Sequence, residues 1–422
     1  MITARPRGTV DVLPEDAARW RCVEEAFKRI CREYNYQEIR TPVFEHTEIF
    51  ERGVGDTTDI VEKEMYTFRD RGDRSVTLRP EGTAPVIRAY LENNLHAGPQ
   101  PVKLYYTGPM FRYDKPQAGR FRQFHQLGAE VLGSADPAVD AELMAMVMDF
   151  YGRMGIRDLE LQINSVGCPR CRSELRARLQ QHFAPVRENL CANCRGRLER
   201  NPLRVLDCKV ERCDQLAAGA PTTVDCLCPD CQEHFRRVRS YLDRLGIPYL
   251  VNGRLVRGLD YYTHTAFEVM ARDIGAQSSI GGGGRYNGLV EVCGGTPTPG
   301  VGYALGVERI ILTMERQGVA FPGPDKPDLF VAAADQSCRE EAVDVLFSLR
   351  RAGLSADKDY LGRSLKAQMK YAGKTGCRYV VILGGDELKR GTVAVKDMAE
   401  GNQFELPLEG LAEDIKKRLK EI

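Results

Sequence analysis

Apolar residues near the start of the chain recur every three or four positions. This spacing predicts a helix over residues 11–35 that buries one face. The buried stripe consists of Trp20, Val23, Phe27, Ile30 and Tyr34. A second helix is expected over residues 137–154, where methionines contribute to an apolar stripe that is typical of a core.

Three stretches have the composition of strands instead. Residues 38–45 contain Pro42, which limits this strand to an edge or an interface. Residues 102–113 and 121–132 flank the polar, basic loop 114–120, and together they predict a long hairpin.

The second strand of this hairpin has two different faces. Leu127, Ala129 and Val131 alternate with polar positions and are expected to pack against a core. The opposite face carries Phe124, Gln126, Gly128 and Glu130. Such a face is often simply solvated, but a glycine gap between an amide and a carboxylate also suits a ligand lying on the sheet.

The C-terminal part of the chain follows the proline-rich linker 322–327. Strands 329–333 and 379–383 alternate with helices there, which predicts a separate α/β domain. The helices are expected over residues 337–352, 363–374 and 410–420. Before the linker, strand patterns occur at 249–251 and 265–270, and a helix is expected near 303–316.

Composition narrows the class of protein. The formal net charge is only +1, so any binding of nucleic acid must come from local patches. Hydrophobic residues at 43% and charged residues at 28% are ordinary for a globular enzyme and argue against disorder. No apolar run is long enough to span a membrane and no secretory signal is visible, so we expect a cytoplasmic protein with no membrane contact.

The cysteines are unevenly placed. Nine of the fourteen lie between residues 168 and 231, and in a reducing compartment such a cluster favours metal binding over disulfides. Two CxxC pairs have a spacing close to that of a tetrathiolate zinc site, so we expect a structural Zn²⁺ on Cys168, Cys171, Cys191 and Cys194. A second set of four remains open to Cys208, Cys213, Cys228 and Cys231.

Three further segments carry residues that could do chemistry. Residues 78–83 place a carboxylate and a hydroxyl at a turn, residues 257–262 combine an arginine, an acid and two phenols, and four glycines at 281–284 follow a strand pattern. The glycines allow close approach of a ligand but match neither the dinucleotide fingerprint nor the P-loop. Each segment alone is equally typical of a loop or a structural salt bridge.

In this order, the segments resemble the histidyl-tRNA synthetases, a family of class II aminoacyl-tRNA synthetases. Residues 41–45 resemble class II motif 1, residues 111–124 motif 2 and residues 306–309 motif 3, while 257–262 and 279–286 resemble the two histidine-specific signatures. The resemblance covers essentially the whole chain. It implies an α+β fold: an antiparallel sheet with helices in a catalytic domain, 1–325, which the small Cys-rich insertion 168–240 interrupts, and a C-terminal α/β anticodon-binding domain, 326–422.

The resemblance also implies which residues bind histidine. Glu81 receives the ammonium with help from Thr83 and Gln126, while Glu130 and Tyr262 contact the imidazole, whose two nitrogens donate and accept. The full implied set is Glu81, Gly82, Thr83, Arg112, Gln126, Glu130, Arg257, Tyr261 and Tyr262.

ATP binding is implied for Arg112, Arg120, Phe124 and Arg309. Guanidinium groups suit this work because they make bidentate contacts with phosphate and stack on adenine. Arg257, Arg112 and Gln126 form the implied catalytic set, in which Arg257 stabilises charge developing at phosphorus. Mg²⁺ is expected to arrive with ATP.

The implied reaction joins L-histidine to tRNA(His) through a histidyl-adenylate, in a homodimer built on motif 1. An alternative is a non-catalytic paralogue that regulates histidine biosynthesis, although such paralogues tend to lose the histidine signature and the C-terminal domain. A pure RNA-binding or stress-sensing module is a third hypothesis.

Four basic residues, Arg363, Lys366, Lys370 and Lys374, are expected on one helical face that is either solvated or in contact with RNA phosphates.

Overall fold

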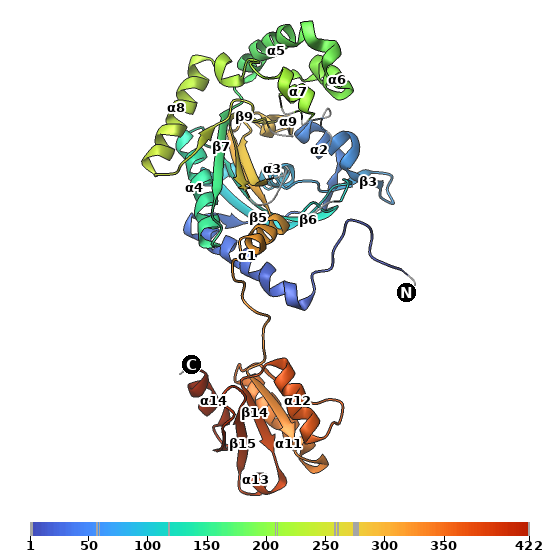
Figure 1. The fold of residues 1–422 in the computed structure, drawn as a ribbon, viewed down its shortest axis with the longest axis vertical. Helices are drawn as coiled ribbons and strands as arrows, with labels where there is room; N and C mark the ends of the chain where they lie inside the picture. The colour runs from blue at the N-terminus through green and yellow to red at the C-terminus, as the bar shows by residue number, and fades with distance from the viewer. Residues whose placement is uncertain are drawn as a thin grey trace. The chain divides into compact units, whose positions relative to one another are not determined.

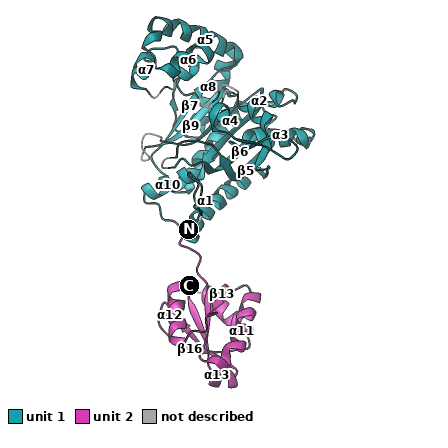
Figure 2. Cartoon of the chain, turned by 90° about the vertical axis from the view of Figure 1, so that its right-hand side faces the viewer, with its two compact units in different colours: residues 1–322 teal, residues 323–422 magenta. Residues whose placement is uncertain are grey.

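The computed structural model divides the chain into two compact units, residues 1–322 and residues 323–422 (Figure 2). It describes residues 3–55, 58, 60–116, 119–206, 208, 210–256, 259, 261–272 and 278–420. The division falls inside the linker segment 322–327. The combination of mixed sheets and helices confirms the predicted α+β class.

The first unit is built on an eight-stranded sheet with the order β1-β5-β6-β11-β10-β9-β7-β8 (Figure 1). The six central strands pair antiparallel, and the short strands β1 and β8 add parallel pairs at the two edges. The strands are β1 (Gln37–Glu38), β5 (Val102–Phe111), β6 (Gln123–Leu132), β7 (Leu159–Ser165), β8 (Leu250–Val251), β9 (Thr263–Ala271), β10 (Ser279–Arg285) and β11 (Gly300–Gly306).

Four helices cover one face of this sheet with a continuous apolar core. The helices are α1 (Pro14–Glu33), α4 (Pro137–Arg153), α8 (Pro229–Arg244) and α10 (Val307–Arg316). Helix α1 lies within the predicted range 11–35, and its Val23, Phe27 and Ile30 are fully buried, which confirms the predicted stripe. The predicted core face of the hairpin is confirmed as well, since Leu127, Ala129 and Val131 are buried in the same core.

One strand was missed and one boundary was wrong. The four glycines follow the strand predicted at 265–270, but they also form the middle of a strand of their own, the central strand β10, which pairs with β9 and β11 on its two sides. The segment 303–306 is strand, and the helix predicted from 303 begins only at Val307.

The other side of the sheet carries a smaller layer. A three-stranded sheet with the order β2-β4-β3 is accompanied by short helices, of which α3 supports the site described below. These elements are β2 (Phe44–His46), α2 (Thr47–Val54), η1 (Ile60–Glu64), β3 (Tyr66–Arg69), β4 (Ser75–Leu78), α3 (Thr83–Glu92), η2 (Leu95–Ala97) and α9 (Leu289–Val292).

The strand predicted over residues 38–45 is split between two sheets. Residues 37–38 pair with β5, and residues 44–46 pair with β4. Between them the Arg79 guanidinium donates hydrogen bonds to the Thr41 carbonyl and hydroxyl oxygens, both at 3.0 Å. Side-chain donors thus replace strand pairing next to Pro42, which has no N–H of its own.

An all-helical insertion leaves the sheet after β7 and has its own apolar core. Its helices are α5 (Pro169–Phe183), η3 (Ala184–Asn189), α6 (Ala192–Arg200), η4 (Pro202–Val205), α7 (Glu211–Leu216) and η5 (Thr223–Cys226). Helix α8, most of which lies inside the expected insertion 168–240, packs its Phe235, Val238 and Leu242 into the catalytic core instead.

The second unit is a five-stranded sheet with the order β13-β12-β14-β15-β16. Helices α11 and α14 share one apolar core with the sheet, and α12 packs on a second one. The elements are β12 (Leu329–Ala333), η7 (Gln336–Cys338), α11 (Arg339–Arg351), β13 (Ala356–Lys358), α12 (Leu365–Thr375), β14 (Tyr379–Leu383), α13 (Gly385–Lys389), β15 (Thr392–Asp397), β16 (Gln403–Pro407) and α14 (Leu411–Lys420). The two antiparallel strands β15 and β16 were not predicted.

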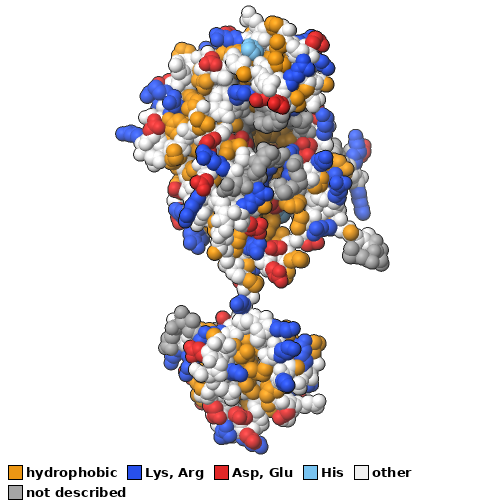
Figure 3. Space-filling view, in the orientation of Figure 1, with side chains coloured by type: hydrophobic (Ala, Val, Ile, Leu, Met, Phe, Trp, Pro, Cys, Tyr) orange, Lys and Arg blue, Asp and Glu red, His pale blue; other side chains and the backbone are white. Residues whose placement is uncertain are grey.

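Basic and acidic side chains are interspersed over the face of each unit seen in Figure 3, in keeping with the formal net charge of +1. Among the helices in the described part of the chain, none combines the length and apolar character needed to cross a bilayer.

Because the second unit encloses its own cores, we expect residues 323–422 to fold when expressed alone. Circular dichroism of this fragment is expected to show a single cooperative thermal transition. A gradual loss of signal without a transition would mean that this unit depends on the rest of the chain.

Candidate functional site

Two buried carboxylates form the centre of the site, and both are held by nearby donors. Glu81 lies in the turn before α3, where its two oxygens accept the backbone N–H groups of Thr83 and Ala84, each at 2.8 Å. This arrangement caps the N-terminus of α3, where partial positive charge favours an anion. Each carboxylate oxygen retains a further lone pair for a ligand.

Glu130, on β6, is surrounded by three hydroxyl groups that donate to its carboxylate oxygens. Thr83 donates to one oxygen at 2.8 Å, Tyr286 donates to the other at 2.6 Å, and the Tyr106 hydroxyl lies 3.4 Å from the first. Thr83 therefore joins the two carboxylates, because its N–H contacts Glu81 and its hydroxyl contacts Glu130. We call Glu81, Thr83, Tyr106, Glu130 and Tyr286 the carboxylate cluster.

Burial dominates the acidity of both carboxyl groups. It raises the pKa of Glu130 to about 8, although the hydroxyl donors of Tyr286 and Thr83 oppose this rise. Burial also raises the pKa of Glu81, against the opposing effect of the two backbone N–H groups. Such carboxyls suit recognition of a ligand that brings its own cationic or N–H groups.

Two glycines make room for the carboxylate cluster. Gly128 faces Tyr106 across the β5–β6 pair, and a Cβ at this position would lie 2.1 Å from the Tyr106 ring. Gly302 pairs with Glu130 across β6 and β11, and a Cβ there would lie 1.6 Å from a carboxylate oxygen. Neither position accepts a side chain without displacing the cluster.

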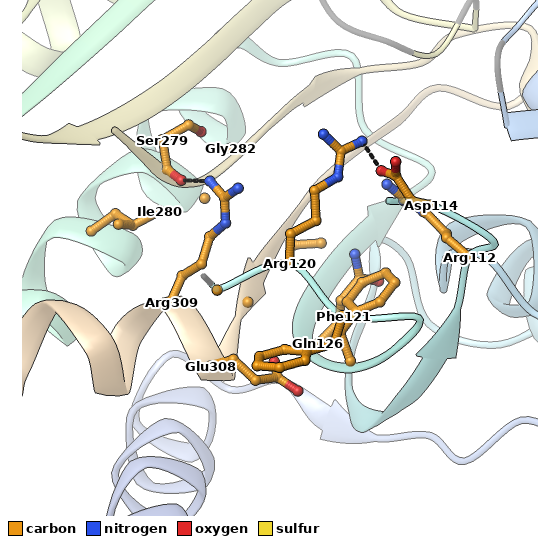
Figure 4. Close-up of a pocket in the computed structure, with 15 residues that line it drawn as sticks. Arg112, Asp114, Arg120, Phe121, Gln126, Ser279, Ile280, Gly282, Glu308 and Arg309 are labelled. Atoms are coloured by element: carbon orange, nitrogen blue, oxygen red, sulfur yellow. Dashed lines mark hydrogen bonds and ion pairs between the residues drawn. The ribbon is translucent and has the colours of Figure 1, made fainter. Parts of the chain in front are cut away.

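Beside the cluster lies a pocket of about 220 Å³ that is rich in arginine (Figure 4). We call it the basic pocket; among the residues that line it are Arg112, Arg120, Phe124, Gln126 and Arg309. The strands β6, β10 and β11 form its floor, and α10 supplies Arg309. A pocket with three guanidinium groups favours phosphate and a planar aromatic ring.

Contacts within the basic pocket position these arginines. Arg112 donates to the Pro80 carbonyl at 2.9 Å and stacks over Phe124 with 5.2 Å between the guanidinium carbon and the ring centre. Arg309 donates to the Ser279 carbonyl, and Arg120 pairs with Asp114 (Figure 4). A phosphate that binds Arg120 competes with Asp114 for this guanidinium group.

Gln126 links the pocket to the carboxylate cluster. It lines the pocket from β6, the strand that also carries Glu130. Its side-chain oxygen is buried and accepts no hydrogen bond from any residue in the described part of the chain. A buried acceptor without a donor is costly, so the position favours a ligand that brings an N–H group.

The structure does not place all expected residues at the pocket. Tyr262 is buried, and it lines a different cavity toward the insertion, together with Val166 and Arg172. Tyr261 connects the two regions, since its ring lies 4.8 Å from that of Tyr262 and 5.8 Å from that of Tyr286. The predicted catalytic residue Arg257 lies outside the described residues.

The roles of Tyr106, Tyr286 and Glu308 were not predicted from the sequence. Glu308 lines the basic pocket and accepts the backbone N–H of His125 at 2.9 Å. Tyr286 and Glu308 lie inside the segments 279–286 and 306–309 that resemble family motifs, which was a signal for both. For Tyr106 the signal was its position opposite Gly128 on the predicted hairpin, because a large ring beside a glycine can lie across the sheet.

The predicted cysteine quartet was wrong, because the fold pairs the CxxC motifs differently. One group, the base cluster, consists of Cys168, Cys171, Cys228 and Cys231. The other, the tip cluster, consists of Cys191, Cys194, Cys208 and Cys213. Within each cluster all sulfur atoms lie within 4.8 Å of one another. The reason is that α8 returns to the start of α5 and brings Cys228 beside Cys168, which sequence spacing does not reveal.

Comparison with known proteins identifies the relatives of this chain. The model of the family described as "Histidyl-tRNA synthetase" matches residues 8–184 and 207–310, and that of "Anticodon binding domain" matches 328–418. The histidine–tRNA ligase of Pelotomaculum thermopropionicum is 68% identical over 99% of both chains, and that of Desulforamulus reducens is 63% identical over 99% of this chain and 100% of its own. The crystal structure of apo histidyl-tRNA synthetase from S. aureus superposes with a TM-score of 0.84 at 42% identity and covers 98% of this chain and 100% of its own.

The raised pKa of Glu130 predicts how stability depends on pH. Between about pH 4.5 and pH 8 the folded protein keeps a proton that the unfolded chain releases, so the free energy of unfolding falls as pH rises. Glu130→Gln removes this titration. We expect the free energy of unfolding of the variant in urea, relative to that of the unmodified protein, to rise by roughly 1 kcal/mol per pH unit in this range. If the free energies of unfolding of the two proteins changed with pH in parallel, Glu130 would not keep its proton in the folded state. Glu48→Gln, which changes an exposed carboxylate, is the control.

Proposed function

The chain belongs to the histidyl-tRNA synthetase family, and we propose that it ligates L-histidine to tRNA(His) with ATP. The carboxylate of histidine attacks the α-phosphorus to form histidyl-adenylate and pyrophosphate, and the histidyl group then passes to the tRNA with release of AMP. The observation that carries this proposal is the placement of two buried carboxylates directly beside an arginine-rich pocket.

The carboxylate cluster supports recognition of the amino acid. In the proposal Glu81 accepts the ammonium, and the unpartnered oxygen of Gln126 accepts a further ammonium N–H. Glu130 accepts the imidazole N–H, while Gly82, Tyr261 and Tyr262 complete the walls. A side chain of similar shape without the N–H leaves these buried groups unpaired, which is a strong basis for rejection.

The basic pocket supports binding of ATP. Phe124 and Arg309 line it and are proposed to hold the adenine ring, while Arg112 contacts the α-phosphate and the histidine carboxylate. Arg120 reaches the terminal phosphates after release from Asp114. Mg²⁺ bound to the phosphates neutralises part of their charge. The assignment of Arg257 to charge stabilisation at phosphorus rests on the family resemblance alone.

We assign catalysis to residues 1–325, with the insertion over 168–240, and anticodon recognition to 326–422. In the second unit Lys366 and Lys370 lie on α12, and Arg363 precedes it. Tyr360 and Leu361 precede this helix and are 66% and 73% exposed, which offers apolar contact for an RNA base beside basic side chains.

The proposed enzyme is a cytoplasmic homodimer. Three apolar side chains are exposed on the small sheet: Val43 just before β2, Phe44 on β2 and Phe68 on β3. An apolar strip on a three-stranded sheet favours burial against a second copy. These strands surround the motif 1 segment 41–45, which supports pairing through that motif.

A structural Zn²⁺ in the insertion is part of the proposal, because thiolates are the ligands that zinc prefers in such sites. The regulatory-paralogue alternative is less supported, since relatives of 63% and 68% identity over the full length carry the ligase name.

The direct test of the function is exchange of pyrophosphate into ATP without tRNA. We expect exchange that requires L-histidine and is not supported by other amino acids, followed by charging of tRNA(His) when the tRNA is added. Exchange without histidine, or none with it, would contradict the proposal.

Variants of the carboxylate cluster and of the basic pocket are expected to change the KM of different substrates. Glu81→Gln removes the ammonium's charged partner and is expected to raise the KM for histidine roughly 30-fold or more, with the KM for ATP nearly unchanged. Arg309→Ala is expected to do the reverse, with roughly a 10-fold rise for ATP. Each variant controls for general damage in the other, and equal effects of either variant on both substrates would contradict the division.

A further inference from the structure

The cysteine sulfurs have the spacing of a tetrahedral metal site in both clusters. A zinc ion with four thiolates at about 2.3 Å separates the sulfurs by about 3.8 Å. In the base cluster the Cys168 sulfur lies 3.6 Å from that of Cys171 and 3.9 Å from that of Cys228. In the tip cluster the sulfurs of Cys191 and Cys208 are 4.0 Å apart.

Backbone groups also point at the sulfurs. The Cys228 N–H donates to the Cys171 sulfur at 3.1 Å, and the Cys191 N–H donates to the Cys213 sulfur at 3.2 Å. Such donors stabilise thiolates, the form that binds metal. All fourteen cysteines are free thiols, and the distances within the clusters far exceed the roughly 2 Å of a disulfide bond.

The two clusters differ in what they connect. The tip cluster lies inside the core of the insertion, where Cys194 and Cys213 are fully buried. The base cluster joins two cores: Cys168 caps α5, which packs in the insertion, and Cys228 caps α8, which packs on the catalytic sheet. A metal in the base cluster therefore fastens the insertion to the catalytic sheet at the point where it leaves and rejoins.

The base cluster also contacts β9, the strand that directly follows Tyr261 and Tyr262. The sulfur of Cys231 lies 3.6 Å from the Nδ1 atom of His264. His264 is anchored to the start of the insertion, since its N–H donates to the Gly167 carbonyl at 3.0 Å and its carbonyl accepts the Val166 N–H at 2.7 Å. It adopts a left-handed conformation, with φ of 48°, that an L residue keeps only when its surroundings enforce it.

This anchored residue stands two positions after Tyr262, which the family resemblance assigns to the imidazole and which is proposed to form a wall of the site. A second contact runs from α8 to the same site: the His234 Nε2 atom lies 3.3 Å from an Asp140 oxygen, and Asp140 forms a fully buried ion pair with Arg285. Arg285 precedes Tyr286, which holds Glu130. Movement of the start of α8 would thus be transmitted both to the segment that follows Tyr262 and, through Arg285 and Tyr286, to Glu130.

We propose that the two clusters hold one Zn²⁺ each and that the two ions have different roles. The zinc of the tip cluster folds the insertion. The zinc of the base cluster clamps the insertion to the catalytic sheet and positions the start of β9, which directly follows Tyr262. The metal sites stand independently of the enzyme's activity, whereas the effect on histidine rests on the function proposed above.

Elemental analysis tests the two sites directly. The full chain, purified under reducing and chelator-free conditions, is expected to carry two zinc ions. Cys171→Ser and Cys194→Ser each change the buried second cysteine of one CxxC motif, and each is expected to retain one ion. Cys31→Ser, a buried core thiol outside both clusters, is expected to retain two. Fewer than two ions in the unmodified chain would overturn the proposal even if a variant failed to fold.

Kinetics test the separate roles. Cys171→Ser is expected to raise the KM for histidine in pyrophosphate exchange by about 10-fold, because misplacement of a positioning strand is costly, and to weaken tRNA charging as well. Cys194→Ser is expected to weaken charging alone. Equal effects of both variants on exchange would overturn the division of roles. Two bound zinc ions in an unmodified chain without histidine-dependent exchange would instead overturn the proposed function and leave the metal sites standing.

Discussion

Two carboxylates, Glu81 and Glu130, are buried in one site, and their need for hydrogen-bond donors determines how the catalytic unit is built there. Removing a carboxylate from water costs several kcal/mol unless donors replace the water, and a second carboxylate nearby adds repulsion. Glu81 meets the requirement with two backbone N–H groups at the start of α3, and Glu130 meets it with hydroxyl groups from three elements. These donors do not fully offset the cost of burial, and the pKa values of both carboxyl groups stay raised. The site therefore favours a ligand that brings further hydrogen-bond donors.

The sheet provides the space that this arrangement needs. Tyr106 reaches Glu130 only because Gly128 leaves the opposite position of the hairpin empty, and Glu130 itself occupies the space that a side chain at residue 302 would take. On the next strand the four consecutive glycines run between β9 and β11, close to the basic pocket, where Gly281 and Gly282 form part of the lining. The glycines in these strands therefore allow both the close packing of the backbones and the placement of the groups proposed to recognise the ligand.

Local patterns in the sequence were sufficient for much of this architecture. The stripe on α1 and the two faces of the hairpin follow from residue spacing, because helices and strands have fixed periods. The contacts of Glu130 could not be predicted in this way. Tyr106 lies on the neighbouring strand of the hairpin, but Thr83 and Tyr286 are far from Glu130 in the sequence, and only the tertiary fold brings all three hydroxyl groups to it. The cysteine pairing failed for the same reason: three CxxC motifs have equivalent chemistry, and the return of α8 to α5 decides which of them meet. Strand β10 was not predicted, because glycine is a poor strand former; at Gly281, Gly283 and Gly284 the neighbouring strands leave no room for a side chain.

The most direct test of this account is a crystal structure of the protein with L-histidine bound. We expect the imidazole N–H within hydrogen-bonding distance of Glu130 and the ammonium between Glu81 and the side-chain oxygen of Gln126, with the carboxylate facing the basic pocket. Histidine bound with its side chain away from Glu130, while Thr83 and Tyr286 keep their hydrogen bonds to that carboxylate, would contradict it.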